Sequence, residues 1–237
     1  MNAIGIDVGG SKIRAVRIRL THRERWNGTR VEKLAVARTP TGAIALTKTL
    51  RRMIAKLEEG KRLKIGTGFA GVIQSGKVVM SPNNRFLKGY DPAKALGRPV
   101  RVENDARTFA RAEYGAGAGK GAARALFFTF GTGVGRAYGI GREIKRVKRF
   151  EYPEKWEKRY QRVKGVPALA PFLAMHLNSI IKGYKPRVIV AGGGVAEKQG
   201  FMAAFRGELK RTGFTGEVRG AKLGTLAGAI GAALVAK

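Results

Sequence analysis

Residues 4–12 read I-G-I-D-V-G-G-S-K, a short apolar run that ends in two glycines. Residues 12–20 then alternate basic and apolar side chains, so the two runs predict a β-hairpin with a tight glycine turn. Glycines in such a turn let backbone N–H groups approach an anion closely. Asp7 stands beside the turn, where a carboxylate can hold magnesium directly or through water. The groups expected to face the anion are Gly9, Gly10, Ser11 and Lys12. An ordinary hairpin without a ligand explains this stretch alone equally well.

The same design recurs in the second half of the chain. Residues 124–130 are apolar and aromatic, and they run into the turn G-T-G-V-G at residues 131–135. A second strand is expected at residues 137–140. Two such hairpins predict a duplicated lobe with a cleft between the halves, and both turns would then face one polyphosphate from opposite sides. This repeat is the strongest evidence on fold class that the residues alone provide.

Residues 102–113, V-E-N-D-A-R-T-F-A-R-A-E, read as the end of a strand, a turn with Asn104 and Asp105, and a helix. The chain has three aspartates in all, the other two being Asp7 and Asp91. A carboxylate at such a turn in so basic a protein leads us to the hypothesis that Asp105 is the general base of a phosphoryl transfer. The alternative is that Asp105 only caps the helix, because Asp and Asn are favoured N-cap residues.

Apolar spacing, glycines and prolines predict the remaining elements. Strands are expected at residues 31–37, 63–67, 72–73, 77–80, 99–102, 187–191 and 217–219. Helices are expected at residues 41–59, 105–114, 166–181, 196–211 and 223–235, and residues 81–96 read as a loop. Pro171 predicts two short pieces or a kink in its helix. The glycines of residues 192–194 stand between a strand and a helix, where a flat ligand can lie against backbone and the helix N-terminus favours anions.

The composition limits the classes of protein to consider. The 237 residues suffice for one large domain or two small lobes, and 44% hydrophobic content is typical of a globular chain. The absence of cysteine excludes disulfides and thiolate metal sites. We find neither a signal pattern nor a run of apolar residues long enough for a membrane span, so a cytoplasmic location and no membrane partner are expected.

The charge is unusual, with 47 basic and 16 acidic residues and a formal net charge of +31. Such a field attracts polyanions, including nucleic acid, polyphosphate and nucleotides. The alternative is that the charge is spread over solvated faces. The basic residues peak at residues 142–164, where aromatic side chains are interleaved. That composition suits single-stranded nucleic acid, or an amphipathic surface segment whose aromatics pack inward.

Taken together, these motifs resemble the ROK family (repressor, open reading frame, kinase) within the actin-like ATPase superfamily, nearly end to end. The motifs that carry the resemblance are I-G-I-D-V-G-G-S-K, G-T-G-F-A-G-V-I, M-S-P-N-N, V-E-N-D-A-R-T-F-A-R-A-E, F-F-T-F-G-T-G-V-G, V-I-V-A-G-G-G-V and L-G-T-L-A-G-A-I-G-A-A-L.

The resemblance implies an α/β, two-lobed actin-like ATPase (ribonuclease H-like) fold, each lobe a mixed five-stranded sheet with helices and a cleft between. Residues 1–104 plus 222–237 would form the N-terminal lobe, and residues 105–221 the C-terminal lobe. The implied activity is an ATP-dependent sugar kinase of the glucokinase type, which transfers the γ-phosphoryl group to a hexose hydroxyl, most simply glucose O6. The implied cofactors are ATP and Mg²⁺, and the family is often dimeric.

The family's functional residues carry over onto matching positions. Asp105 would accept the sugar hydroxyl proton, and Asp7 would help to position Mg²⁺. The phosphates would be held by Gly9, Gly10, Gly131, Thr132 and Gly133, the sugar by Gly71, Asn83 and Asn104, and the adenine would be bordered by Gly193 and Gly194.

The chain also departs from the family. Many members carry a Gly-Glu-Ile-Gly-His sugar motif followed by a Cys-rich zinc site, and neither is present, so no zinc is expected. Glu151 or Glu154 falls near the place of the family's sugar-binding Glu. Arg136 stands where the family usually has glycine, and it would either neutralise phosphate or obstruct it. These departures leave the sugar open.

Two alternatives to an ATP-dependent kinase remain. One is a polyphosphate-dependent hexokinase, and the other is a non-catalytic relative that binds nucleic acid. The family's DNA-binding repressors carry an extra N-terminal winged helix, and this chain begins directly at the hairpin, which argues against that branch.

Overall fold

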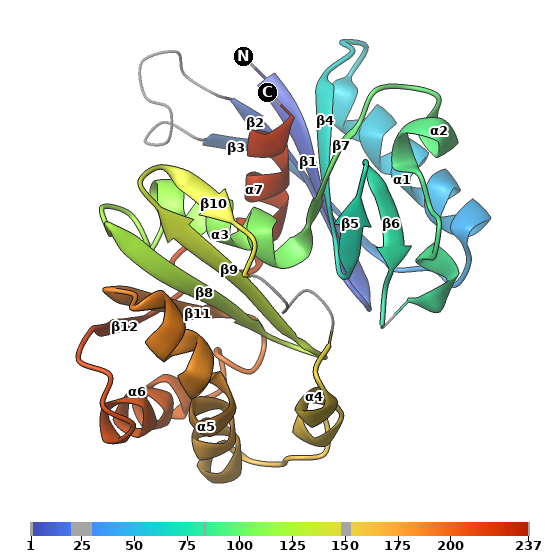
Figure 1. Ribbon diagram of the computed structural model, residues 1–237. Helices are drawn as coiled ribbons and strands as arrows, with labels where there is room; N and C mark the ends of the chain where they lie inside the picture. Colours follow the sequence, from blue (N-terminus) through green and yellow to red (C-terminus); the bar gives the residue numbers. More distant parts are fainter. Residues whose placement is uncertain (1, 20–29, 83, 148–152, 237) are drawn as a thin grey trace.

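Two mixed five-stranded sheets frame the protein in a computed structural model that describes residues 2–19, 30–82, 84–147 and 153–236 (Figure 1). The first sheet has the order β3-β2-β1-β4-β7 and the second the order β10-β9-β8-β11-β12. In each sheet the central strand pairs antiparallel with the strand that follows its glycine turn, and parallel with a later strand on its other side. The two halves therefore share one topology, which confirms the predicted duplication.

The strands of the first sheet are β1 (Asn2–Val8), β2 (Lys12–Arg19), β3 (Arg30–Arg38), β4 (Lys64–Phe69) and β7 (Arg101–Asn104). Those of the second are β8 (Arg124–Phe130), β9 (Val134–Ile140), β10 (Glu143–Lys145), β11 (Val188–Gly192) and β12 (Glu217–Gly220). A separate hairpin is formed by β5 (Val72–Gln74) and β6 (Lys77–Met80). The helices are α1 (Ala43–Glu58), α2 (Pro92–Leu96), α3 (Asp105–Ala116), α4 (Lys155–Tyr160), α5 (Val166–Tyr184), α6 (Phe201–Arg211) and α7 (Ala227–Val235).

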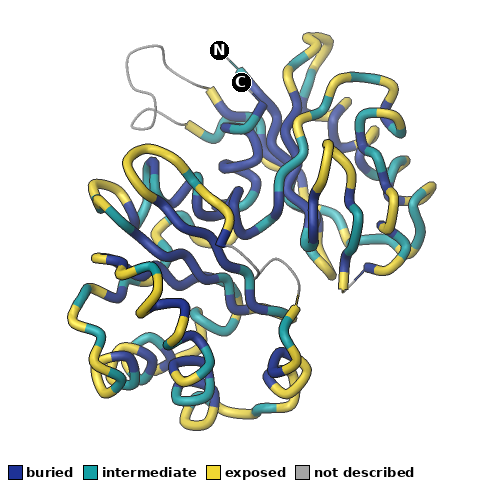
Figure 2. The backbone as a smooth tube through the Cα atoms, in the orientation of Figure 1, coloured by how far each residue is buried: buried dark blue, intermediate teal, exposed yellow. Residues whose placement is uncertain are grey.

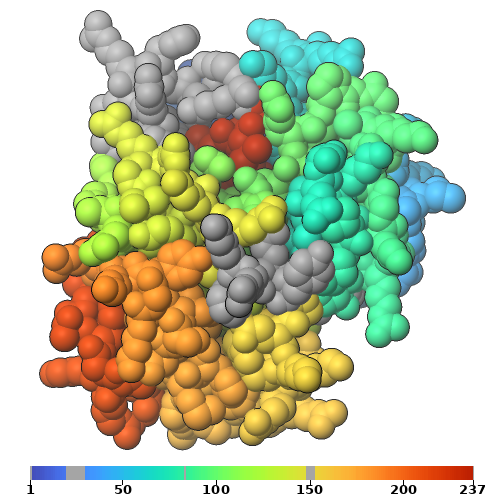
Figure 3. All heavy atoms as spheres, viewed as in Figure 1, coloured from blue at the N-terminus to red at the C-terminus, as the bar shows by residue number. Residues whose placement is uncertain are grey.

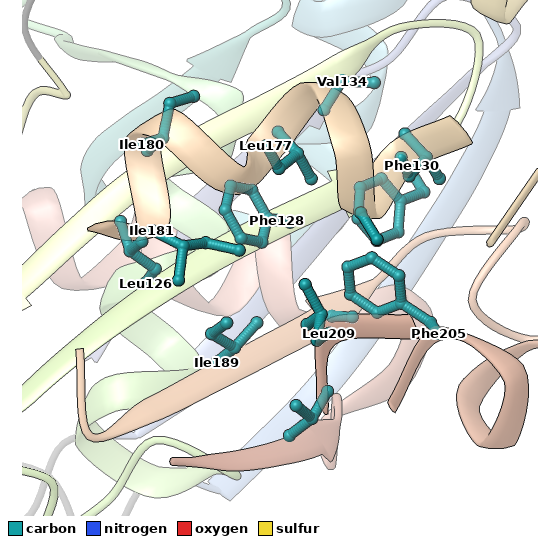
Figure 4. Packing of buried hydrophobic residues seen from close by; sticks show 14 of the residues in the cluster. Leu126, Phe128, Phe130, Val134, Leu177, Ile180, Ile181, Ile189, Phe205 and Leu209 are labelled. Carbon is teal, nitrogen blue, oxygen red and sulfur yellow. The ribbon is translucent and has the colours of Figure 1, made fainter. Parts of the chain in front are cut away.

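Both central strands are buried on both faces, as Figure 2 shows for the middle of each lobe. Alternate residues of β8 face opposite ways. Phe128 and Phe130 pack against α5 and α6 (Figure 4), and Phe127 packs on the side of α3. In β1, Ile4 and Ile6 belong to the cluster that includes the buried face of α1. The helices α3 and α7 therefore lie between the two sheets, and each sheet carries its own outer helices.

The contact of α7 with the first sheet and with α3 depends on small residues. A Cβ atom added at Gly5 would lie 1.9 Å from the carbonyl oxygen of Ala229, and one added at Gly231 would lie 1.7 Å from that of Thr108. Backbone thus packs directly on backbone, which explains the run of alanine and glycine in α7. In the space-filling view α7, in red, lies recessed between the two lobes (Figure 3).

Several element boundaries differ from those expected. The helix expected from residue 196 begins at Phe201, because residues 194–200 form turns, and residues 224–226 form a 3-10 turn ahead of α7. Residues 81–96 hold a 3-10 turn and α2, which Asp91 caps by accepting from the N–H of Lys94 at 3.0 Å. The expectation of two pieces at Pro171 is wrong: α5 is one helix, since this proline lies in its second turn and the apolar face is buried throughout.

Among the described residues, no helix is both long enough and apolar enough to cross a membrane.

Candidate active site

A cleft of about 230 Å³ lies between the two sheets, where both glycine turns and the start of α3 meet. The predicted site residues that line it are Gly9, Gly10, Gly71, Asn104, Asp105, Gly131, Thr132, Gly133 and Gly193. Ser11 and Lys12 are exposed at the same turn as Gly10, and they are not among the lining residues, nor are Gly194 and Glu154. Asn83 and Glu151 lie outside the described residues. The fold therefore brings into one cleft predicted site residues that are up to 184 positions apart in the sequence, from Gly9 to Gly193.

Asn104 and Asp105 have different contacts at the start of α3. The residue that caps the helix is Asn104, whose Oδ1 accepts from the N–H of Arg107 at 3.2 Å. Its Nδ2 donates to the carbonyl oxygen of Gly71 at 2.8 Å and to Oδ1 of Asp105 at 3.1 Å. The alternative that Asp105 serves only as the cap is therefore wrong, and its carboxylate lines the cleft.

Burial raises the pKa values of both aspartates, although Asp7 is not among the residues that line the cleft and lies against Gly228 of α7. Burial raises the pKa of Asp105 to about 6, against the opposing effects of nearby N–H groups and of Arg107. Burial raises the pKa of Asp7 to about 7, and the negative charge of Asp105 adds to the effect while Arg14 opposes it. Because the negative charge of Asp105 disfavours ionisation of Asp7, a cation bound at Asp7 would relieve that repulsion. Mg²⁺ bound with a nucleotide needs one or two protein carboxylates, so Asp7 fits as a ligand, directly or through water. Among the described residues no group of three or more His, Cys, Asp or Glu side chains suits a metal.

Both glycine turns are held by neighbouring elements. In the first turn, the hydroxyl of Thr39 donates to the carbonyl oxygen of Gly9 at 2.8 Å. The backbone N–H of Thr39 donates to the carbonyl oxygen of Ser11 at 3.0 Å. In the second, the hydroxyl of Tyr160 on α4 donates to the carbonyl oxygen of Gly131 at 3.0 Å. The turns are thus fixed through their carbonyl groups.

Gly135 lets the second turn abut the start of α3. A Cβ atom there would lie 2.2 Å from Oγ1 of Thr129 and 2.8 Å from Cβ of Ala106. Because Ala106 follows Asp105, this close approach sets the second turn against the candidate base.

Gly193 follows β11 with a φ of +88°, and a Cβ atom there would lie 2.6 Å from the carbonyl oxygen of Phe130. Only glycine fits both the positive φ and the close approach to Phe130, so the end of β11 packs directly against the second turn. The expected helix N-terminus does not follow directly, because α6 starts at Phe201. The argument that a helix dipole favours an anion at these glycines is therefore wrong.

Two charged residues also line the cleft. Glu157 was not predicted as a site residue, and the role of Arg136 was left open. The Glu157 side chain accepts from Arg136 at 2.8 Å and from the N–H of Glu154 at 3.1 Å. The signal that could have found it is its position in W-E-K-R-Y, where a glutamate shares a helix face with Trp156 and Tyr160, both buried. A carboxylate among buried aromatics needs a partner, and that need points to a site.

Residues 3–146 match the model of the ROK family. The chain belongs to the ROK family. A glucokinase of Streptomyces coelicolor is 33% identical over 155 residues, which make up 60% of this chain and 45% of that protein. An N-acetylgalactosamine kinase of Shewanella sp. (strain ANA-3) is 30% identical over 139 residues, 55% of this chain and 42% of that protein. The match to this ROK chain thus spans less than half the length of either relative.

A solved ROK family glucokinase from Streptomyces griseus, in complex with glucose and AMPPNP, has the same fold. It aligns over 98% of this chain and 98% of its own, with a TM-score of 0.80 and 23% sequence identity. The predicted two-lobed ROK fold is therefore confirmed.

Proposed function

We propose that this chain is an ATP-dependent sugar kinase, which transfers the γ-phosphoryl group of ATP to a hexose hydroxyl with Asp105 as the general base. The observation that carries the proposal is the position of Asp105. It lies in one cleft with both glycine turns, relieved of the capping role by Asn104, with its pKa raised to about 6. A base poised near neutral pH is suited to accept a hydroxyl proton. The ROK relatives named glucokinase and N-acetylgalactosamine kinase support the reaction class.

Phosphoryl transfer requires positioning and charge neutralisation more than covalent chemistry. The turns at Gly9-Gly10 and at residues 131–133 would place backbone N–H groups around the phosphates, with Gly193 beside the adenosine. Asp7 would hold Mg²⁺, directly or through water, and the bound ion would supply positive charge that neutralises the phosphates. Asn104 keeps the Asp105 carboxylate in place through the hydrogen bond at 3.1 Å and is itself fixed by Gly71.

The sugar would occupy the part of the cleft that Gly71, Asn104 and Asp105 line. Glu157 supplies a second carboxylate to the cleft. We propose that it accepts hydrogen bonds from sugar hydroxyls in place of the predicted Glu154, which accepts from Nε1 of Trp156 at 2.8 Å. Glucose O6 is the acceptor that we propose first. The two relatives act by name on different sugars, so the acceptor panel should include N-acetylated hexosamines.

The test is ADP formation with Mg²⁺ and ATP across hexoses and N-acetylated hexosamines, for wild type, Asp105→Ala and Asp91→Asn. We expect Asp105→Ala to lower kcat by about 100-fold to 10,000-fold, the usual contribution of a general base. Asp91→Asn is the matched control, because Asp91 caps α2 and pairs with Lys77 at 3.6 Å. Equal turnover by wild type and Asp105→Ala would remove Asp105 as the base. No sugar-dependent turnover by folded wild type would remove the kinase.

A further inference from the structure

Arg136 is a buried cation in a chain that otherwise has many exposed ones. It lies on β9, directly after the second glycine turn, and its side chain is 1% exposed. Its guanidinium is 2.8 Å from Oε1 of Glu157, 3.6 Å from Oε1 of Glu154, and 5.2 Å from the centre of the Trp156 ring. These three partners, which are among the described residues, belong to one segment around α4. Arg136 therefore ties α4 to the strand that carries the turn.

Glu157 lies on the cleft side of this contact. Its Oε2 is 3.4 Å from the backbone nitrogen of Val134, and it would be 3.8 Å from a Cβ atom at Gly133. A bare carboxylate at this distance from a turn that binds phosphate would repel the phosphate, and little water is present to screen the repulsion. A carboxylate there is compatible with phosphate binding only when a cation compensates its charge.

We infer that Arg136 is a positioning residue, which holds Glu157 in the cleft and cancels its charge beside the second glycine turn. This rests on the proposed function, since it assumes a phosphate donor at that turn. Arg136 keeps Oε1 of Glu157 occupied, so that Oε2, which accepts from the N–H of Val134 at 3.4 Å, retains the capacity to accept from a substrate hydroxyl as well. One buried ion pair thereby lets a hydroxyl-binding carboxylate and a phosphate-binding turn stand side by side.

The rival role for Arg136 is direct contact with the phosphate. The two roles differ in what happens when both charges are removed. If Arg136 acts through Glu157, neutralising Glu157 makes the arginine dispensable for the donor. If Arg136 contacts the phosphate, the donor remains weakly bound whatever stands at position 157. A pair of neutral, similar-sized side chains replaces a buried ion pair with little disturbance, so the double variant is expected to fold.

The variants are Arg136→Met, Glu157→Gln, the double variant, and Arg159→Met as the control. Arg159 is on α4, the helix that also carries Glu157. It is exposed, and its guanidinium lies 6.0 Å from the centre of the Phe172 ring. The readouts are the Kd of the magnesium complex of AMPPNP, the KM of the best sugar, and Tm. We expect Arg136→Met to weaken AMPPNP binding by about tenfold or more, since it leaves a like charge at the phosphate. The double variant should return to within about threefold of wild type, and both Glu157 variants should keep a raised sugar KM.

A double variant that binds AMPPNP as weakly as Arg136→Met overturns the inference in favour of direct phosphate contact. Wild-type affinity in Arg136→Met overturns it in favour of a purely structural arginine. If Arg136→Met does not fold, the double variant is compared with Glu157→Gln, and a tenfold weaker double variant overturns the inference. Failure of the proposed function looks different, because wild type would then not bind AMPPNP, or would bind it without sugar turnover. In the second case the binding arm still tests Arg136.

Discussion

Asp7 and Asp105 have different surroundings, which suit them to the two different roles that we propose for them. Both are raised in pKa by burial, but Asp105 is surrounded by N–H donors and by Arg107, whereas Asp7 feels the negative charge of Asp105. Repulsion between two charges is reciprocal, so the pair titrates as a unit, with Asp105 ionising first. Asp105, which ionises first as pH rises, is suited to act as a base. Asp7 retains its proton to higher pH, so a bound cation would lower its pKa the most.

The pH profile of kcat/KM should follow Asp105. Its carboxylate must be ionised to accept a proton, and it is protonated below its pKa of about 6. We therefore expect log kcat/KM, at saturating Mg²⁺, to be level above this value and to fall about tenfold per pH unit below it. A rate profile that stays level down to pH about 5 would contradict the assignment of Asp105 as the base.

Replacing Asp105 by asparagine should raise the free energy of unfolding and abolish the activity. A carboxyl whose folded-state pKa is raised binds its proton more tightly in the folded state, so its contribution to stability is present at low pH and is lost as pH rises through about 6. At pH about 8, Asp105→Asn should raise the free energy of unfolding by about 1–2 kcal/mol, after allowance for partial solvent exposure. Thermal unfolding at pH about 8, about 5 and about 4 tests this, because the gain should fall to about half at pH about 5 and become small at pH about 4.

Some site residues could be predicted because local chemistry marks them. Glycine turns after apolar runs, and an aspartate beside an asparagine at a strand-to-helix turn, are visible in the sequence. Arg136 and Glu157 could not be paired from the sequence, because their contact joins a strand to a helix 21 residues later and depends on how α4 packs. Glu154 and Glu157 differ only in which face of α4 they occupy.

At the scale of elements, existence was predicted better than boundaries. The hairpins were expected from their apolar runs, and they are present. The start of α6 was misjudged because Gly200 was not taken as a boundary, although this glycine, with a φ of +77°, directly precedes the helix. The chain entering α7 is held by Glu113, which is fully buried and accepts from the N–H groups of Lys222 at 3.1 Å and Leu223 at 2.7 Å. No local pattern marks that contact, which spans more than 100 residues.

The crossing of α7 and α3 should not tolerate one added methyl group. A Cβ atom at Gly231 would lie 1.7 Å from the carbonyl oxygen of Thr108, and backbone cannot yield as a side chain does. We expect Gly231→Ala to lower the free energy of unfolding by at least about 3 kcal/mol. Gly207→Ala is the control on α6, where nothing lies within 4 Å, and it should raise stability by about 0.5–1 kcal/mol. Denaturant unfolding decides this, and equal effects of the two substitutions would count against the close crossing.

At the scale of the molecule, the duplication explains why two distant stretches share one cleft. In each half a glycine turn follows the central strand, at Gly9-Gly10 in the first half and at residues 131–135 in the second. The packing of α3 and α7 brings these two strand ends together. We propose that residues 1–104 with 222–237 and residues 105–221 are the two units that close on the substrates. The repeat could be predicted because hairpin patterns are local. How the halves pack could not, because it depends on glycine contacts such as Gly5 with Ala229.

The net charge of +31 should affect one substrate and not the other. A positive field concentrates ATP or polyphosphate near the cleft and is screened by salt, whereas a neutral hexose is not steered. Raising salt from about 50 mM to about 300 mM should therefore raise the KM for ATP several-fold and leave the KM for the sugar unchanged. Steady-state kinetics with both substrates gives the control within one experiment. A rise in both KM values would indicate that salt perturbs the cleft itself, and no rise in either would place the excess charge on faces that the donor does not approach. Inorganic polyphosphate, assayed beside ATP at fixed sugar, then shows whether the same field admits a longer phosphoryl donor.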